Sequence, residues 1–139
     1  MTSRMRSFVH TVACIKVHVV FVTKYRHPVI HGEIESEIAS ICQSICNKND
    51  CILEQAKADL GTCDHIHLLI DLASKVSLSK LCNVLKTVTS REVRKHYATE
   101  LKPYYWKPVF WKRGFSAVSA GGASLDVLKE YIENQGYDN

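Results

Sequence analysis

The sequence predicts an α+β fold of the ferredoxin-like or RRM-like kind, in which helices cover one face of an antiparallel sheet. Three observations predict it: runs of β-branched residues, segments with apolar residues at helical spacing, and the order in which the two kinds alternate. The order is strand, helix, strand, strand, helix, strand, helix, which is a split βαβ arrangement with one extra helix. The 139 residues contain no linker or repeat, so residues 1–139 are expected to form one domain.

The first half of the chain supplies a strand, a helix and a pair of strands. Cys14–Thr23 is rich in β-branched residues and predicts a mostly buried strand. A helix that runs to about Lys48 follows, because isoleucines recur on one helical face at Ile34, Ile38, Ile41 and Ile45. Residues 51–58 and 63–71 then predict two further strands, joined by a tight connection.

The second half begins with a long helix over Ser77–Tyr97, for which Ser77 is a suitable N-cap. Segment 101–113 is both aromatic and basic. Residues 109–119 predict a fourth strand, interrupted at Gly114. A final helix is expected over Leu125–Gln135. This helix would carry the tyrosine discussed below.

Composition permits a polyanionic partner without requiring one, since the net charge is only +4. No apolar run reaches the roughly 18 residues of a membrane span, so we expect no membrane partner. Residues 1–6 are not followed by an apolar stretch, and we expect no signal peptide. The six cysteines are therefore expected to be reduced thiols of a cytoplasmic protein.

Asp64-His65-Ile66-His67 places two imidazoles on one face of a predicted strand, because side chains alternate between faces. Two such imidazoles can bind one divalent ion if a third ligand approaches from elsewhere. Neutral imidazole suits zinc, manganese, iron or copper, whereas magnesium prefers oxygen and would need help from phosphate and water. The alternative is structural: one histidine packs in the core and the other faces solvent.

Tyr131 and Gln135 are four residues apart and share a face of the predicted final helix. A tyrosyl oxygen can attack a phosphodiester, and an amide oxygen can bind a metal. Tyrosine is a poor nucleophile at its usual pKa of about 10, so a divalent metal at the phosphate would be needed. The alternative is an ordinary amphipathic helix with a partly buried tyrosine.

Basic residues are distributed along the chain in a way that suits a nucleic-acid surface. The candidate DNA contacts are Lys24, Arg26, Lys86, Arg91, Arg94, Lys112 and Arg113. Aromatic residues interleave with lysines in segment 101–113, as a surface that stacks bases requires. A solvated charged helix face and core packing of the aromatic residues are the alternatives.

With these motifs the chain resembles the small single-tyrosine HUH transposases of the insertion-sequence 200/605 type. The segments that carry the resemblance are His18–Arg26, Asp64–His67, Leu85–Lys86 and Gly121–Gln135. The histidine pair alone is weak evidence, but its combination with the final helix at this spacing is specific.

The resemblance implies that His65 and His67 are metal ligands, Gln135 the third ligand and Tyr131 the nucleophile. It also implies a homodimer that acts on single-stranded DNA with hairpins near the element ends. Cleavage would leave a 5′-phosphotyrosine and a free 3′-hydroxyl, with Mg²⁺ or Mn²⁺ as the expected cofactor. Such a protein would be prokaryotic and associated with the nucleoid when active.

Three alternative functions stay open at this point. A domesticated single-tyrosine relative would act on repeated palindromes. A ferredoxin-like module that binds RNA or single-stranded DNA would need neither the histidines nor Tyr131. A metal-dependent phosphohydrolase would use an activated water and form no covalent adduct.

Overall fold

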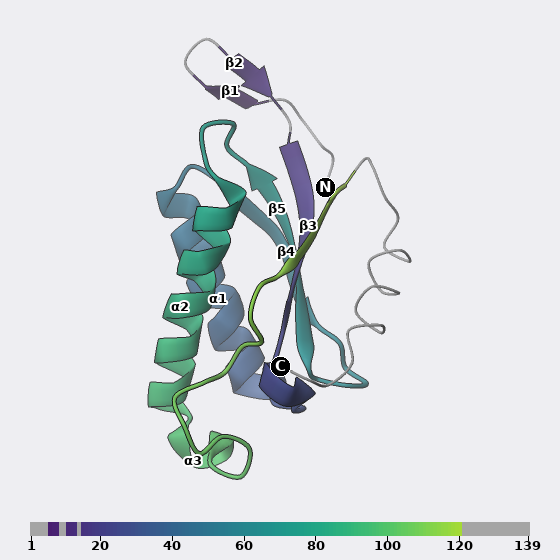
Figure 1. Cartoon of the computed structure of the whole chain (residues 1–139). Helices are drawn as coiled ribbons and strands as arrows, with labels where there is room; N and C mark the ends of the chain where they lie inside the picture. Colours follow the sequence, from purple (N-terminus) through teal and green to yellow (C-terminus); the bar gives the residue numbers. More distant parts are fainter. Residues whose placement is uncertain (1–5, 9–10, 14, 121–139) are drawn as a thin grey trace.

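The computed structural model describes residues 6–8, 11–13 and 15–120, with side chains from residue 15 onward. Two sheets and two long helices make up these residues (Figure 1). The elements are β1 (Arg6–Phe8), β2 (Thr11–Ala13), β3 (Ile15–Val22), η1 (Lys24–Arg26), α1 (Gly32–Lys48), β4 (Ile52–Ala58), β5 (His65–Leu72), α2 (Leu78–His96), α3 (Ala98–Leu101) and β6 (Ser116–Ser119).

The main sheet has the strand order β4-β5-β3-β6, and every neighbouring pair is antiparallel. This order is that of a split βαβ fold, and the predicted fold class is confirmed. The strands predicted over residues 14–23, 51–58 and 63–71 correspond to β3, β4 and β5. The two long helices also lie where the apolar spacing predicts them, and the side chain of Ser77 accepts a hydrogen bond from Lys80 N as the N-cap of α2.

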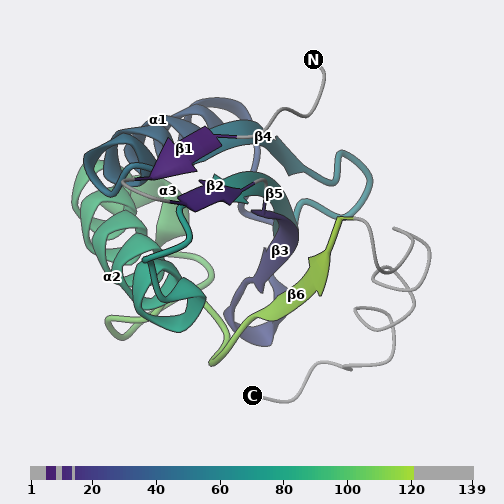
Figure 2. The same cartoon turned by 90° about the horizontal axis from the view of Figure 1, so that it is seen from above.

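Helices α1 and α2 lie side by side on one face of the sheet (Figure 2). The core between helices and sheet contains the fully buried Phe21, Ile38, Ile66 and Leu85. The opposite face of the sheet is covered by no helix of the described residues and is called the open face below; it carries a small separate cluster of Val20, Val22 and Val118. The helix-covered side of the sheet therefore forms the main core, and the other side carries only a small apolar cluster.

Three features differ from the sequence-based expectation. Strands β1 and β2 form a small hairpin before β3 that no sequence pattern indicated. Helix α3 follows α2 after a break at Tyr97. The fourth strand covers only Ser116–Ser119 and not residues 109–119, because Gly114 turns with φ 75° and Trp111 makes only an isolated bridge to Thr23. The helix predicted over Leu125–Gln135 lies outside the described residues.

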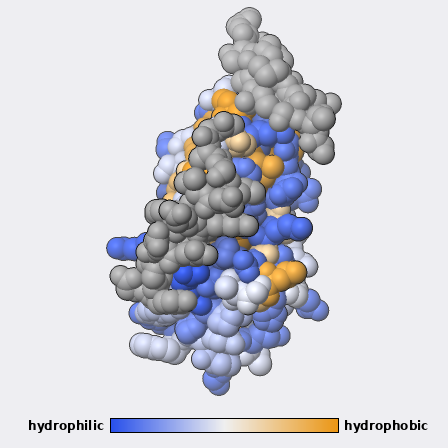
Figure 3. All heavy atoms as spheres, turned by 90° about the vertical axis from the view of Figure 1, so that its right-hand side faces the viewer, coloured by the Kyte–Doolittle hydropathy of each residue, from blue (hydrophilic) through white to orange (hydrophobic). Residues whose placement is uncertain are grey.

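Within the described residues no helix is long and apolar enough to cross a bilayer. Five of the six cysteines fall in the described part as free thiols: Cys42, Cys46, Cys51, Cys63 and Cys82. The side of the molecule away from the helices is mainly hydrophilic where its atoms are coloured, with small hydrophobic areas between (Figure 3).

Candidate metal centre

His65 and His67 lie on the open face of the sheet, at the start of β5. The register of the sheet sets this: His65 is opposite Val22 and His67 is opposite Val20, while Ile66 between them is fully buried in the core. Both imidazoles are half-buried. The prediction that they share one face is confirmed, and neither packs in the core between sheet and helices.

Asp64, a buried residue, orients the imidazole of His65. Its Oδ2 accepts a hydrogen bond from Arg26 Nε at 2.9 Å, and its Oδ1 lies 2.8 Å from His65 Nδ1. An ionised carboxylate can only accept hydrogen bonds, so Nδ1 carries a proton, and in the neutral ring Nε2 keeps its lone pair. Asp59 Oδ2 is 3.9 Å from that Nε2, beyond hydrogen-bonding distance. A carboxylate–histidine pair of this kind fixes the tautomer that a metal requires.

Asp64 is ionised at neutral pH. Burial raises the pKa of Asp64, but hydrogen bonds from His65, Thr62 and Arg26, together with the charge of Arg26, outweigh burial and lower the pKa to about 2. The side chains of Asp64 and Arg26 are only 5% and 8% exposed, so solvent screens this pair weakly. The pair is therefore a fixed part of the structure beside His65.

The corner after β3 brings Arg26 to Asp64. Tyr25 and Arg26 have φ values of 60° and 54°, the left-handed region that non-glycine residues seldom adopt. Thr23 holds this corner against the start of β5, because its N donates to Asp64 O at 2.9 Å and its Oγ1 donates to His27 O at 2.9 Å. The backbone thus turns sharply enough for Arg26 to lie against the carboxylate.

His18 is a third imidazole on the open face. Its Nδ1 lies 2.7 Å from His67 Nε2, which is a hydrogen bond in which one nitrogen donates and the other accepts. The ring centroids are 4.8 Å apart with an interplanar angle of 29°. Because the two nitrogens lie between the centroids, the rings meet edge to edge and not face to face. Burial lowers the pKa of His18, which favours the neutral form of this ring.

The donor set at this place fits a divalent cation. His65 offers a free Nε2 with a carboxylate behind it, and His67 lies two residues along on the same face. No group of three or more His, Cys, Asp or Glu side chains in the described part of the chain is arranged to hold a metal. Gln135, the amide expected to serve as the third ligand, lies outside the described residues, as does Tyr131. At His67 Nε2 a metal would replace the hydrogen bond to His18.

Lys86 is tied to the loop that precedes β6. Its Nζ donates to Lys112 O at 2.7 Å and to Gly114 O at 2.5 Å. Burial lowers the pKa of Lys86 to about 8, with Lys112 contributing in the same direction. Lys112 N donates to Val22 O at 2.7 Å, which holds the loop beside the strand end opposite His65. Lys86 thus supports the segment that carries Lys112 and Arg113.

The other candidate DNA contacts are spread over the structure. Arg91 lies at the surface with Nε 3.2 Å from Glu92, and Arg94 Nε donates to Ser90 Oγ at 3.1 Å. Both belong to α2 and so lie on the covered side of the sheet, away from the histidines. Lys24 Nζ is 5.3 Å from the ring centroid of Tyr25 at the corner after β3. Arg26 serves Asp64, as described above.

Comparison with known proteins is consistent with these features. The family described as "Transposase IS200 like" matches residues 11–135, nearly the whole chain. The chain belongs to the IS200-like transposase family. The transposase for insertion sequence element IS200 of Salmonella typhimurium strain LT2 is 33% identical to it over 131 residues, which are 94% of this chain and 82% of that protein. The ISDra2 transposase TnpA of Deinococcus radiodurans is 25% identical over 121 residues, with 87% and 84% of the two chains covered.

Solved structures share the fold of this IS200-like transposase. A proposed transposase from Deinococcus radiodurans R1 superposes with a TM-score of 0.82 at 22% identity, covering 95% of this chain and 98% of the other. A REP-associated tyrosine transposase bound to a REP hairpin gives a TM-score of 0.51 at 12% identity, covering 94% and 68%. The family resemblance expected from the sequence is confirmed.

His18 and Asp64 of this IS200-like transposase also belong to the site, although the sequence pattern does not predict a role for either. The alternation of side chains along β3 offered a signal for His18, because it places His18 on the same face as Val20 and Val22. These two valines pair with His67 and His65 of β5. Which strands pair, and in which register, is not visible in the sequence. Only the structure therefore brings His18 to His67.

Proposed function

We propose that this IS200-like transposase cleaves and rejoins single-stranded DNA at hairpin-marked element ends through a covalent 5′-phosphotyrosine at Tyr131. The observation that supports this best is the pair of imidazoles on the open face, one of them held in a metal-binding tautomer by Asp64. A binding module without catalysis would have no use for that arrangement. We also propose His65, His67 and Gln135 as ligands of Mg²⁺ or Mn²⁺.

The proposed reaction exchanges one phosphate ester for another. The Tyr131 oxygen attacks phosphorus and forms the phosphotyrosine bond, and the bond from phosphorus to the 3′-oxygen breaks. The tyrosine loses a proton and the released 3′-oxygen gains one, so the products are a 5′-phosphotyrosine and a 3′-hydroxyl. Attack by a different 3′-hydroxyl on the phosphotyrosine reverses the step and joins two new ends. No external energy source is needed.

The chain's own residues prepare the site for this step. A bound divalent metal supplies charge that polarises a nonbridging phosphate oxygen. Asp64, which is ionised and accepts a hydrogen bond from Arg26, keeps the proton on His65 Nδ1, and His65 Nε2 stays available as a ligand. The two imidazoles are neutral when they act as ligands, so they leave the cation's charge available to the phosphate.

The proposed partner is single-stranded DNA that contains a hairpin. The REP-associated tyrosine transposase that shares the fold is bound to a REP hairpin. Lys112 and Arg113 lie in the loop beside Val22, near the start of β5, where they suit phosphate contacts. We further propose that the protein acts as a homodimer.

A covalent-adduct assay tests the proposal. Labelled hairpin oligonucleotides from the DNA that flanks the gene are incubated with protein and Mn²⁺ or Mg²⁺, then separated on a denaturing gel. We expect a labelled protein band that chelator abolishes and that Tyr131→Phe and His65→Ala both lack. Tyr137→Phe is the matched control, because it alters a tyrosine in the same C-terminal segment and should keep the band.

Other outcomes of this assay separate the alternatives. Cleaved DNA without an adduct would indicate a phosphohydrolase and remove Tyr131 from the reaction. Bound DNA with neither cleavage nor adduct, in any metal, would indicate a binding module. Adduct formation with palindromic repeats but not with element ends would indicate the domesticated relative.

A further inference from the structure

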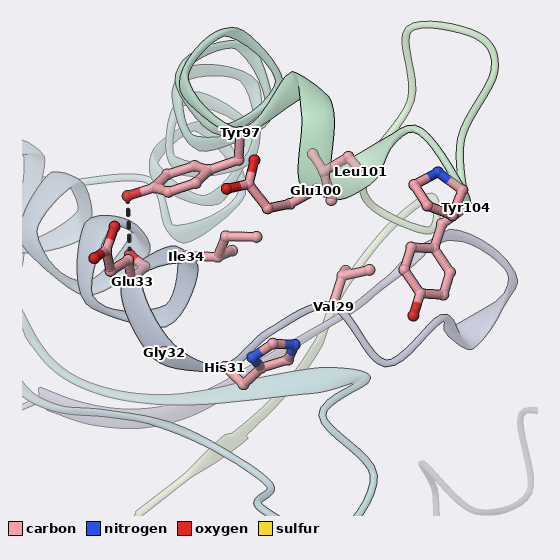
Figure 4. A pocket seen from close by; sticks show the side chains of 10 residues that line it. Val29, His31, Gly32, Glu33, Ile34, Tyr97, Glu100, Leu101 and Tyr104 are labelled. Carbon is pink, nitrogen blue, oxygen red and sulfur yellow. Dashed lines mark hydrogen bonds between the residues drawn. The ribbon is translucent and has the colours of Figure 1, made fainter.

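Two surface hollows of similar size lie near α3, and they differ in charge. One, of about 540 Å³, is bordered by Glu33 and Glu100 and by the ring of Tyr97, whose hydroxyl donates to Glu33 O at 3.4 Å (Figure 4). The other has a volume of about 600 Å³ and contains three cations and no acidic side chain. Its lining residues are Arg94, Ala98, Leu101, Lys102, Tyr105, Trp106, Lys107 and Pro108. An anionic ligand would avoid the first hollow and favour the second.

Trp106 in the basic hollow is exposed to an unusual degree. Its side chain belongs to a residue that is 87% exposed, although tryptophan is the largest apolar side chain and is normally well buried. Lys107 Nζ lies 5.5 Å from the centroid of its ring. The hollow therefore offers a flat aromatic surface next to positive charge, which is the combination that binds unpaired nucleotides: the base stacks and the phosphates pair with cations.

The floor of the hollow is joined by hydrogen bonds to the histidine end of the sheet. Tyr105 is buried beside Trp106, and its hydroxyl donates to Lys24 O at 2.8 Å. Lys24 N in turn donates to Phe110 O at 2.8 Å, and the preceding residue, Thr23, is bonded to Asp64 O. A nucleotide held at Trp106 would thus sit at a fixed offset from the candidate metal centre.

We infer that this basic hollow is a binding site for an unpaired nucleotide of the DNA strand, with the base stacked on Trp106 and the phosphates near Lys102, Lys107 and Arg94. The inference deepens the proposed function, because it takes the same single-stranded DNA as ligand. An acidic peptide would satisfy the cations but would leave most of the exposed indole surface uncovered. The nucleotide satisfies both.

Tryptophan fluorescence and DNA affinity test the site directly. The chain has two tryptophans, and Trp111 is buried with its Nε1 bonded to Thr89 Oγ1 at 2.9 Å, so quenching by added DNA reports on Trp106. The full chain with Tyr131→Phe, which removes the proposed nucleophile, is titrated with a labelled hairpin that carries a single-stranded oligo-dT flank. We expect quenching that Trp106→Phe abolishes.

The affinity of the same DNA should follow the aromatic surface. Trp106→Ala is expected to weaken binding by about 5-fold to 150-fold, the range for loss of one stacked base, and Trp106→Phe should recover part of the loss. Lys102→Ala should weaken binding and reduce its salt dependence by about one charge. Lys80→Ala is the matched control, since Lys80 is also exposed but lies at the opposite end of α2.

Three results would overturn the site. They are the absence of quenching, an affinity of Trp106→Ala within twofold of its parent, and equal quenching by poly-glutamate. Separate results test the nucleotide site and the cleavage proposal. An adduct formed normally by a Trp106→Ala chain that keeps Tyr131, with unchanged affinity, would remove the site and keep the cleavage, whereas quenching without any adduct would do the reverse.

Discussion

Asp64→Asn is expected to lower the free energy of unfolding by about 2–4 kcal/mol at pH 7. The pKa of Asp64 is about 2 against an ordinary value of 3.8, a difference worth about 2 kcal/mol. Asparagine also leaves the guanidinium of Arg26, whose side chain is 8% exposed, without its charged partner, which adds to the loss. Because the folded-state pKa is depressed, this stabilisation is complete above pH 4 and disappears as the pH falls towards 2.

The measurement is urea unfolding of both proteins in chelator, at pH 7 and again near pH 2.5. Asp50→Asn is the matched control. Asp50 and Lys75 are also 2.9 Å apart, but their side chains are 61% and 66% exposed, so the loss should stay below about 1 kcal/mol. The φ of 61° at Asp50 is one that asparagine tolerates well.

The reasoning would be refuted by a loss for Asp64→Asn no larger than that of the control. It would also be refuted if the difference from wild type were as large at pH 2.5 as at pH 7. Either result would mean that burial of the ion pair contributes nothing beyond what a surface pair contributes.

Three further predictions concern other parts of the molecule. His18→Ala should raise Mn²⁺ affinity about 2-fold to 10-fold in calorimetry, because the hydrogen bond that competes for the neighbouring imidazole is lost; a fall in affinity would show that His18 is itself a ligand. The stability of the wild type should rise between pH 8 and 10.5, because the unfolded chain binds more protons there than the folded one, and Lys86→Met should remove this rise. After discounting for partial exposure of Lys86, the rise is about 1 kcal/mol. It is measured by comparing the unfolding of wild type and variant at the two ends of that pH range. Cys63, which is partly exposed, should react with a thiol reagent in the native protein, whereas Cys46 and Cys82, whose pKa burial raises to about 12, should react only after unfolding; mass spectrometry of labelled peptides identifies the sites.

Local pattern was enough to predict the main elements and the shared face of the histidines. The β-branched run of β3 and the isoleucine spacing of α1 are properties of neighbouring residues, so they are visible in one sequence. The alternation of His65, Ile66 and His67 has the same local origin. The order β4-β5-β3-β6 then follows from the rules for split βαβ folds.

Contacts between residues far apart in the chain could not be predicted from the sequence. The His18–His67 hydrogen bond spans 49 positions and the Arg26–Asp64 pair spans 38, and both depend on strand register and on two left-handed residues at a corner. The start predicted for the last strand, residue 109, was wrong for a similar reason, since β6 begins at Ser116. Trp111 makes only an isolated bridge to Thr23, Gly114 turns the chain, and Lys86 binds the carbonyls of residues 112 and 114.

The alternation along β5 divides the effects of mutation between neighbouring positions. Changes at Ile66 and Leu68 fall in the core and should reduce folding yield while sparing the chemistry of whatever protein remains. Changes at His65 and His67 should leave the folding yield nearly unchanged and reduce the activity of the folded protein. A single-residue deletion within the strand would exchange the two sets, burying imidazoles and exposing isoleucine. The alternation of side chains along β5 therefore serves both folding and the candidate metal site, and an insertion or deletion within the strand would disrupt both.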